Sequence, residues 1–235
     1  MEIELFESNN GRCPYLNQRE WLSYTFRANH LDGKVYESLI DQGFRRSGLY
    51  FYKNNCSECE ECRSIRIIVN EFKMSKSQRR TWNKNQDLTL ESHPVKFDRD
   101  SFDLYSRYTM IRHNGESSER GYREFLIRSA VETIMVRYSL GERLVGVSWL
   151  DVLPHSLSSV YFAFDTEFEK RRLGVFSALK EIEMARSMDK SYLHMGFWVK
   201  DCLAMSYKNQ YKPYQLLVKN HWKGMEWVSK THTGS

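Results

Sequence analysis

The sequence predicts an α+β protein, and two observations in its second half predict this class. Alternating apolar residues mark three successive strands over residues 133–165: TIMVRYSL, RLVGVSWLDV and SVYFAFD. The segment GVFSALKEIEMARSM then has helical spacing in Phe176, Leu179 and Ile182, and YLHMGFWV returns as a further strand. Antiparallel strands followed by a helix and another strand form a mixed fold with one large sheet.

The remaining elements fit the same class. Gly141-Glu142 predicts a tight hairpin between the first two of these strands. Upstream of residue 93, KVYESLIDQ reads as a short helix, and LYFYK and SIRIIVNEF read as strands. DLYSRYTMIRH and REFLIRSA read as helices. Pro94 and a cluster of charges between residues 93 and 103 interrupt the pattern, so we expect an N-terminal lobe over 1–93 and a second domain over 94–235.

Composition excludes several protein classes. With 235 residues, of which 41% are hydrophobic, the chain can bury a real core. No segment reaches the roughly 20 uninterrupted apolar residues that a bilayer requires. The start MEIELFESNNGRCPY has neither the basic beginning nor the apolar run of a signal peptide. We therefore expect a cytoplasmic protein without a membrane partner, in a compartment where disulfides are disfavoured.

The net charge of +5 is modest, but the positive residues are bunched. KMSKSQRRTWNK, residues 73–84, contains five basic residues and no acid. KNQYKPYQLLVKNHWK, residues 208–223, mixes lysines with aromatic rings. Basic groups neutralise phosphates and flat rings stack on unpaired bases, so the two segments favour a nucleic acid with single-stranded ends. Each segment alone is equally compatible with a solvated surface.

Three of the five cysteines lie in NNCSECEECRSIR, at positions 56, 59 and 62, between two expected strands. The thiols would then lie on the turn of a hairpin, which is a common place for a metal site. Cys13 could add a fourth thiolate from another segment, and four sulfur ligands suit zinc or an iron–sulfur cluster. Free or partly oxidised thiols are the alternative.

The order of strands and helix is also that of an acetyltransferase-like (GNAT) core. An acetyl-CoA enzyme of this kind needs small residues at the start of the main helix, where backbone amides reach the pyrophosphate. Here the stretch RRLGVF has Gly174, but Phe176 stands where a small residue is needed. This argues against coenzyme A as the acyl carrier.

Several blocks of sequence extend in order over roughly residues 10–217: CPYL, GFRRSGLYFYKNNC, CEECRSIRI, FKMSKSQRR, VGVSWLDVLPHSLSSVYFAFD, GVFSALKEI and MSYKNQYKPYQLL. Together they resemble the aminoacyl-tRNA–protein transferases, and within that family they are most similar to the bacterial aspartate/glutamate leucyltransferase branch. The resemblance implies a GNAT-like domain that needs no coenzyme A. It also implies transfer of leucine, or alternatively arginine, from aminoacyl-tRNA to proteins with N-terminal Asp or Glu, which degradation machinery then recognises.

This reaction requires a neutral amine and a stabilised oxyanion. We expect Asp165 to hold or deprotonate the amine and Tyr161 to share its face. Ser158 and Ser159 are candidate oxyanion donors, and Tyr207 could protonate the departing ribose oxygen.

An acidic acceptor calls for a bidentate guanidinium. The candidates for binding the acceptor or the tRNA are Arg45, Arg46, Arg66, Lys76, Arg79, Arg80, Lys208 and Tyr211. Neighbours in an extended segment point to opposite faces, so only one of Arg45 and Arg46 is expected to enter the site.

No cofactor is required for transfer, but Cys13, Cys56, Cys59 and Cys62 remain candidate ligands for an iron–sulfur cluster or zinc. The eukaryotic arginyltransferases have C-x-x-C where this chain reads CPYL, so the pattern is altered here. Two alternative functions stay open: a GNAT acyltransferase that uses acyl-CoA, and an RNA-binding module without catalysis.

Overall fold

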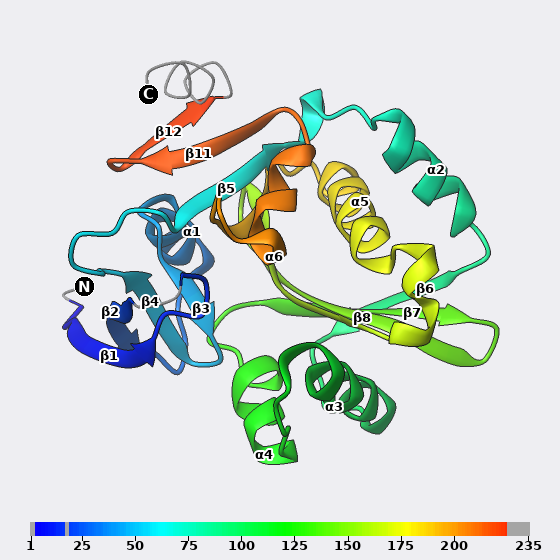
Figure 1. Ribbon diagram of the computed structural model, residues 1–235, viewed down its shortest axis with the longest axis horizontal. Coiled ribbons are helices and arrows are strands. Elements are labelled where there is room, and N and C mark those ends of the chain that lie inside the picture. Colours follow the sequence, from blue (N-terminus) through cyan, green and yellow to red (C-terminus); the bar gives the residue numbers. More distant parts are fainter. Residues whose placement is uncertain (1–2, 17–18, 225–235) are drawn as a thin grey trace.

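The computed structural model describes residues 3–16 and 19–224, which form two β-sheets and the helices that cover them. The small sheet has the strand order β1-β2-β4-β3 and lies beside one end of the large sheet (Figure 1). Its strands are β1 (Phe6–Arg12), β2 (Glu20–Arg27), β3 (Arg45–Ser47) and β4 (Tyr50–Asn54).

One face of the small sheet is covered by helix α1 (Gly33–Asp41). The helix begins where the Asp32 side chain accepts a hydrogen bond from the Lys34 N–H, a standard N-cap. Phe26 and Phe51 stack 5.0 Å apart on this face, and Tyr36 of α1 meets Phe51 edge-on. This aromatic cluster belongs to a second core, which Ala130, Val131 and Leu153 from the second half of the chain complete.

The large sheet has eight strands in the order β12-β11-β5-β10-β9-β8-β7-β6. They are β5 (Arg63–Ile68), β6 (Thr89–Pro94), β7 (Thr133–Leu140), β8 (Arg143–Val152), β9 (Ser156–Phe164), β10 (Tyr192–Trp198), β11 (Tyr214–Val218) and β12 (His221–Gly224). Only β9 and β10 pair in parallel, because helix α5 (Leu173–Ser187) connects them. The predicted hairpin is confirmed: Leu140 pairs with Arg143, and Gly141 adopts φ +59°.

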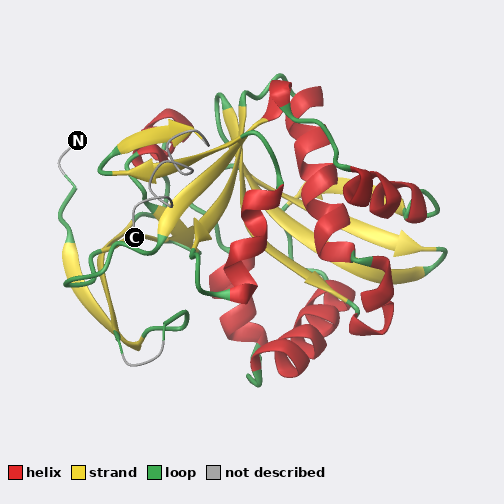
Figure 2. Ribbon diagram, turned by 45° about the horizontal axis from the view of Figure 1, so that its top comes forward, coloured by secondary structure: helices red, strands yellow, loops and turns green. Residues whose placement is uncertain are grey.

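Helices cover both faces of the large sheet (Figures 1 and 2). Helices α2 (Lys76–Lys84), α5 and α6 (Leu203–Ser206) lie on one side, and α3 (Arg99–His113) and α4 (Glu119–Tyr122) lie on the other. Shorter turns are η1 (Val69–Glu71), the π-helical η2 (Arg123–Ile127), η3 (Thr166–Arg171) and η4 (Tyr207–Gln210). None of the helices in the described part of the chain has the length and apolar character needed to cross a bilayer.

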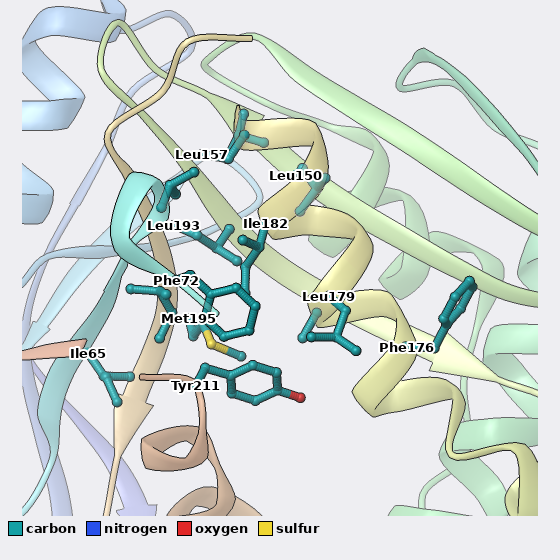
Figure 3. Close-up of a cluster of buried hydrophobic side chains, with 14 of the residues drawn as sticks. Ile65, Phe72, Leu150, Leu157, Phe176, Leu179, Ile182, Leu193, Met195 and Tyr211 are labelled. Carbon is teal, nitrogen blue, oxygen red and sulfur yellow. The ribbon is translucent and has the colours of Figure 1, made fainter. Parts of the chain in front are cut away.

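The main core lies between α5 and the large sheet (Figure 3). Phe176, Leu179 and Ile182 are each 1% exposed, which confirms the predicted apolar face of this helix. The side chain of Phe176 packs into the core, with its ring centroid 5.8 Å from that of Trp82 and 6.2 Å from that of Tyr138. The expectation that it would obstruct phosphate groups at the helix start is therefore wrong, because helical geometry turns it inward.

Two expectations about the N-terminal half also differ from the structure. β4 and β5 do not form a hairpin: β4 pairs with β2 and β3 in the small sheet, whereas β5 pairs with β10 and β11 in the large one. The cysteine segment therefore connects two sheets. The division at residue 93 falls within β6, which pairs with β7, so residues 63–94 build the large sheet together with the second half of the chain.

Candidate active site

The candidate site lies where β9 and β10 separate. The two strands pair in parallel over three residues only, and the last pair is His194 with Ser158. β10 stays paired with β5, but its register shifts beyond His194, where Gly196 adopts φ +78°. From Ser159 onward, β9 has no ladder partner in β10. Backbone groups without a ladder partner are available to a side chain or to a ligand.

Arg45 and Arg46 of β3 reach different parts of the large sheet. Arg45 donates from Nη1 to Ser158 Oγ over 3.0 Å and from Nη2 to the Ser159 carbonyl oxygen over 2.6 Å. Arg46 forms a bidentate pair with Asp151 of β8, with Nε–Oδ2 and Nη2–Oδ1 distances of 3.0 and 2.5 Å, and both side chains are fully buried. Arg46 thus joins the small sheet to the large one, while Arg45 reaches the strand separation, as expected for neighbours on opposite faces.

Lys208 of η4 lies at the same place and is 9% exposed. Its Nζ donates to the Phe197 carbonyl oxygen over 2.8 Å and lies 3.2 Å from Met205 Sδ. Burial, together with the smaller effect of the nearby Arg45 charge, lowers the pKa of Lys208 to about 7. A Cβ added to Gly196 would lie 3.7 Å from both Lys208 Nζ and Arg45 Nη2, so the two cationic groups flank one small volume.

Glu181 of α5 faces the separation from the helix side and is 2% exposed. Burial raises the pKa of its carboxyl to about 7, although the Ser148 and Ser159 hydroxyls act in the opposite direction. Ser148 Oγ donates to Glu181 Oε1 over 2.9 Å. The sequence analysis missed this residue. Its sequence position could have indicated its burial, because Glu181 lies between Ala178 and Ala185 on the buried face of α5.

Two tyrosines from η4 and the following turn surround Glu181. Although 37% of Tyr207 is exposed, burial of its hydroxyl end raises the pKa to about 12, and the Glu181 charge contributes. Tyr211 is 1% exposed and belongs to the main core (Figure 3). Its ring is therefore not available to stack on a base, contrary to the expectation that it contacts the acceptor or the tRNA.

Asp165 and Tyr161 lie away from this cluster. Asp165 follows β9, and six residues of strand lie between it and Ser158, which puts the two residues about 23 Å apart along the strand. Its carboxylate accepts from the Glu167 N–H over 3.1 Å and pairs with Arg143 over 2.5 Å. The Tyr161 hydroxyl instead lies 3.2 Å from His113 Nε2 within an aromatic cluster under α3. No contact in the described chain joins Asp165 and Tyr161, so the structure does not bring them together.

The contacts of Arg66 are all with neighbouring side chains of the fold. Its guanidinium lies between the rings of Tyr192 and Trp222, 3.8 and 4.2 Å from their centroids. It also pairs with Asp41 of α1 over 3.0 Å and donates to Gln215 over 2.8 Å. These contacts hold the C-terminal hairpin against α1.

The basic segment at residues 73–84 forms helix α2, which begins with a capping box between Ser75 and Gln78. The basic residues that this helix exposes are Lys76, Arg79, Arg80 and Lys84. Gln78 donates to the Gln210 carbonyl oxygen over 3.3 Å, and Arg172 donates to Ser77 over 2.8 Å. These contacts place a positive surface next to η4 and the start of α5.

Cys13, Cys56, Cys59 and Cys62 line one pocket of about 380 Å³ between the small sheet and the end of β11. All four are free thiols. Burial, together with the smaller effect of the other three thiols, raises the pKa of Cys62 to about 12. The Leu16 N–H donates to Cys13 Sγ over 3.4 Å. Within residues 3–16 and 19–224, no group of three or more Cys, His, Asp or Glu side chains is arranged to hold a metal ion.

Comparisons with known proteins give consistent matches along the chain. The family model described as arginine-tRNA-protein transferase, N terminus, matches residues 11–80, and the model of its C terminus matches residues 100–218. The aspartate/glutamate leucyltransferase of Chromobacterium violaceum is 35% identical over 218 residues, which cover 91% of this chain and 90% of that one. The protein of the same name from Thiobacillus denitrificans is 36% identical over 229 residues, 95% of each chain.

Among solved structures, L-PGS from Bacillus licheniformis is similar in fold, with a TM-score of 0.50 and 11% identity over 71% of this chain and 59% of that chain. At this identity the likeness concerns the fold alone.

Proposed function

The chain belongs to the arginine-tRNA-protein transferase family, and we infer from this that it transfers leucine from aminoacyl-tRNA to proteins whose first residue is Asp or Glu. The observation that carries the proposal is the similarity, over nine-tenths of both chains, to relatives named aspartate/glutamate leucyltransferase. The modified protein then displays a leucine that degradation machinery recognises. Because charged tRNA is cytoplasmic, the reaction takes place there.

The catalytic half is GNAT-like. The support for this is an antiparallel β7-β8-β9 meander, the crossover helix α5, and a parallel β10 that separates from β9. In this arrangement the 3′ end of the tRNA enters the opening between β9 and β10. The exposed basic residues of α2 lie next to that opening and neutralise phosphates of the tRNA acceptor stem.

The buried acid on α5 provides a route for the proton. As the acceptor amine forms a bond with the ester carbonyl carbon, its proton passes to Ser159 Oγ, whose own proton passes to Glu181. Collapse of the tetrahedral intermediate breaks the bond to the ribose oxygen, which takes a proton from Tyr207. Glu181 then returns its proton to Tyr207. The two groups are near enough for the Glu181 charge to raise the pKa of the Tyr207 hydroxyl.

Ser159 is partly exposed and suits this role, whereas Ser158 is fully buried and held by Arg45. An acid with a pKa near the working pH accepts and returns a proton at little cost. The pKa of the acceptor amine, ordinarily about 7.7–8.0, leaves a usable neutral fraction.

The test is direct. The protein is incubated with tRNA charged with labelled Leu, Arg or Phe and with peptides that differ only in beginning with Asp, Glu or Ala. We expect leucine to appear on the Asp and Glu peptides. Absence of transfer from every tRNA to every peptide would refute the proposal, and arginine transfer alone would change the donor. Thermal stabilisation by acetyl-CoA would favour the acyl-CoA alternative.

We also propose that the four pocket thiols bind zinc or an iron–sulfur cluster. Four sulfur donors suit either group, and the support for this proposal is that all four thiols line the same pocket. Binding would require the segment of residues 55–62 to close around the metal, and the metal would then fix the connection between the two sheets.

Metal content tests this proposal independently of activity. Protein purified without oxygen should contain one zinc ion or the iron of one cluster per chain, measured by elemental analysis and by absorption in the visible range. The triple variant Cys56→Ser, Cys59→Ser, Cys62→Ser should contain neither. If both proteins lack metal, the thiols bind none.

A further inference from the structure

Arg45 is a buried guanidinium without a carboxylate partner. It is 7% exposed, and no ion pair joins it to any acidic residue in the described part of the chain. Arg46 has Asp151 and Arg66 has Asp41, while Arg79 and Arg80 are exposed on α2. Of the five arginines considered for the acceptor, Arg45 alone is both buried and without a counter-charge.

Lys208 adds a second buried cation beside it. The groups that influence the Lys208 ammonium are Arg45 and the Cys202 thiol, and no carboxylate is among them. A charge removed from water requires a partner, so burial beside the Arg45 guanidinium disfavours the charged form of Lys208 and lowers its pKa. An anion bound between them would supply that partner.

Unused donors point to the nature of that anion. A guanidinium has five N–H groups and an ammonium has three. Arg45 makes two hydrogen bonds, and Lys208 makes one to a carbonyl oxygen and one contact with sulfur. Gly196 has no side chain, and a Cβ at this position would already contact both groups at 3.7 Å, so the glycine keeps this side of the two groups free of a protein side chain.

The position of this site suits an N-terminal residue that is bound both at its α-amine and at its side-chain carboxylate. In an N-terminal Asp the amine and the side-chain carboxylate are only a few bonds apart. In the protein, Ser159 contacts both Arg45 and Glu181. Its carbonyl oxygen accepts a hydrogen bond from Arg45, and its hydroxyl interacts with the Glu181 carboxyl. The cationic pair and the proton acceptor therefore lie on two sides of one residue.

A groove lies nearby, on the same face of the small sheet as the Arg45 side chain. It has a volume of about 510 Å³ and is lined by hydroxyl and aromatic side chains of the uncovered face of the small sheet, together with Phe125. One of these residues, Tyr52, is the register partner of Arg45. Residues that follow the first one of an acceptor would lie along this groove.

We propose that Arg45 and Lys208 bind the side-chain carboxylate of the acceptor's first residue and so determine the requirement for Asp or Glu. The inference rests on the proposed function and assigns the residues that would make it selective. Arg46, Arg66, Arg79 and Arg80 then have other roles.

The test compares acidic acceptors with their amides. Transfer of leucine is measured with peptides that differ only in beginning with Asp or Asn, at saturating Leu-tRNA, with product detected by mass spectrometry. Arg45→Gln and Lys208→Gln should each lower kcat/KM for the Asp peptide about 10- to 100-fold, the loss expected for a charge-assisted hydrogen bond. The Asn peptide should change much less, and the KM for Leu-tRNA should not change.

Two matched variants separate recognition from folding. Ser158→Ala removes one hydrogen bond between Arg45 and β9 but keeps both cations, so it should affect the Asp and Asn peptides by the same factor. Arg45→Lys keeps the charge and should keep the preference for Asp. Equal losses with both peptides in Arg45→Gln and Lys208→Gln would overturn this inference. Absence of transfer by the unaltered protein would instead refute the proposed function.

Discussion

Glu181→Gln should remove a large part of the pH dependence of stability. A pKa raised from 4.5 to about 7 by burial means that the folded protein holds this proton more tightly than the unfolded chain does. At about 1.4 kcal/mol per pH unit, this corresponds to roughly 3 kcal/mol. The stabilisation is fully present below the unfolded pKa of the carboxyl and is lost as the pH rises through about 7.

The assay is urea unfolding of the protein and of Glu181→Gln from about pH 4 to about pH 8. The free energy of unfolding should fall by roughly 3 kcal/mol more in the unaltered protein than in the variant over this range. Tyr138, Tyr207 and Tyr211 around the carboxyl have raised pKa values and stay neutral, so they do not obscure the difference. Parallel curves for the two proteins would refute the assignment of Glu181 as a buried, titrating acid. Transfer by the variant should also fall about 100-fold or more, because the proton acceptor is lost.

Three further predictions concern other charged residues. Arg46→Met should lower the free energy of unfolding by about 3–5 kcal/mol, because it leaves Asp151 buried and unpaired. Arg46→Met with Asp151→Leu should recover much of this loss in urea unfolding, and no recovery would contradict the ion-pair explanation. Arg79→Gln with Arg80→Gln should weaken Leu-tRNA binding for all acceptors and reduce the slope of log affinity against log salt by about 1–2, measured by filter binding. Asp165→Asn should lose stability and keep kcat, because its carboxylate caps η3 and pairs with Arg143 away from the cluster of Ser159 and Glu181. A fall in kcat far larger than any change in tRNA affinity would instead show that Asp165 binds the amine.

Local patterns predicted the elements of the second half of the chain well. The strands β7, β8 and β9, the turn at Gly141, and the buried face of α5 all follow from periods of two and of 3.6 residues that a short window contains. The connection from β4 to β5 was interpreted incorrectly, because two consecutive strands with a short connection usually form a hairpin. Here β5 finds a better partner in β10, 130 residues later in the chain, and the cysteines lie between sheets instead of on a turn.

The candidate site was predictable by residue type but not by role. Arg45 and Arg46 are adjacent and chemically identical, and only the fold distinguishes them: one meets Asp151, and the other meets Ser158 and Ser159, more than 100 residues away in sequence. In the sequence, the residue type of Glu181 does not distinguish it from an exposed glutamate on a helix, because its burial depends on neighbours from other elements. Lys208 resembled one of several lysines in a basic segment, because burial is a property of packing and leaves no local mark.

By itself, the sequence of this protein determined the order of helices and strands between residues 133 and 198, the basic character of the 73–84 segment, and the family to which the chain belongs. These properties depend on residues close together in sequence or on motifs in a set order. The tertiary structure decided which cations are paired, which are buried without a partner, and which acid lies beside the separating strands. Those properties depend on desolvation and on contacts between β3, β9, α5 and η4, and such contacts exist only when the chain is folded.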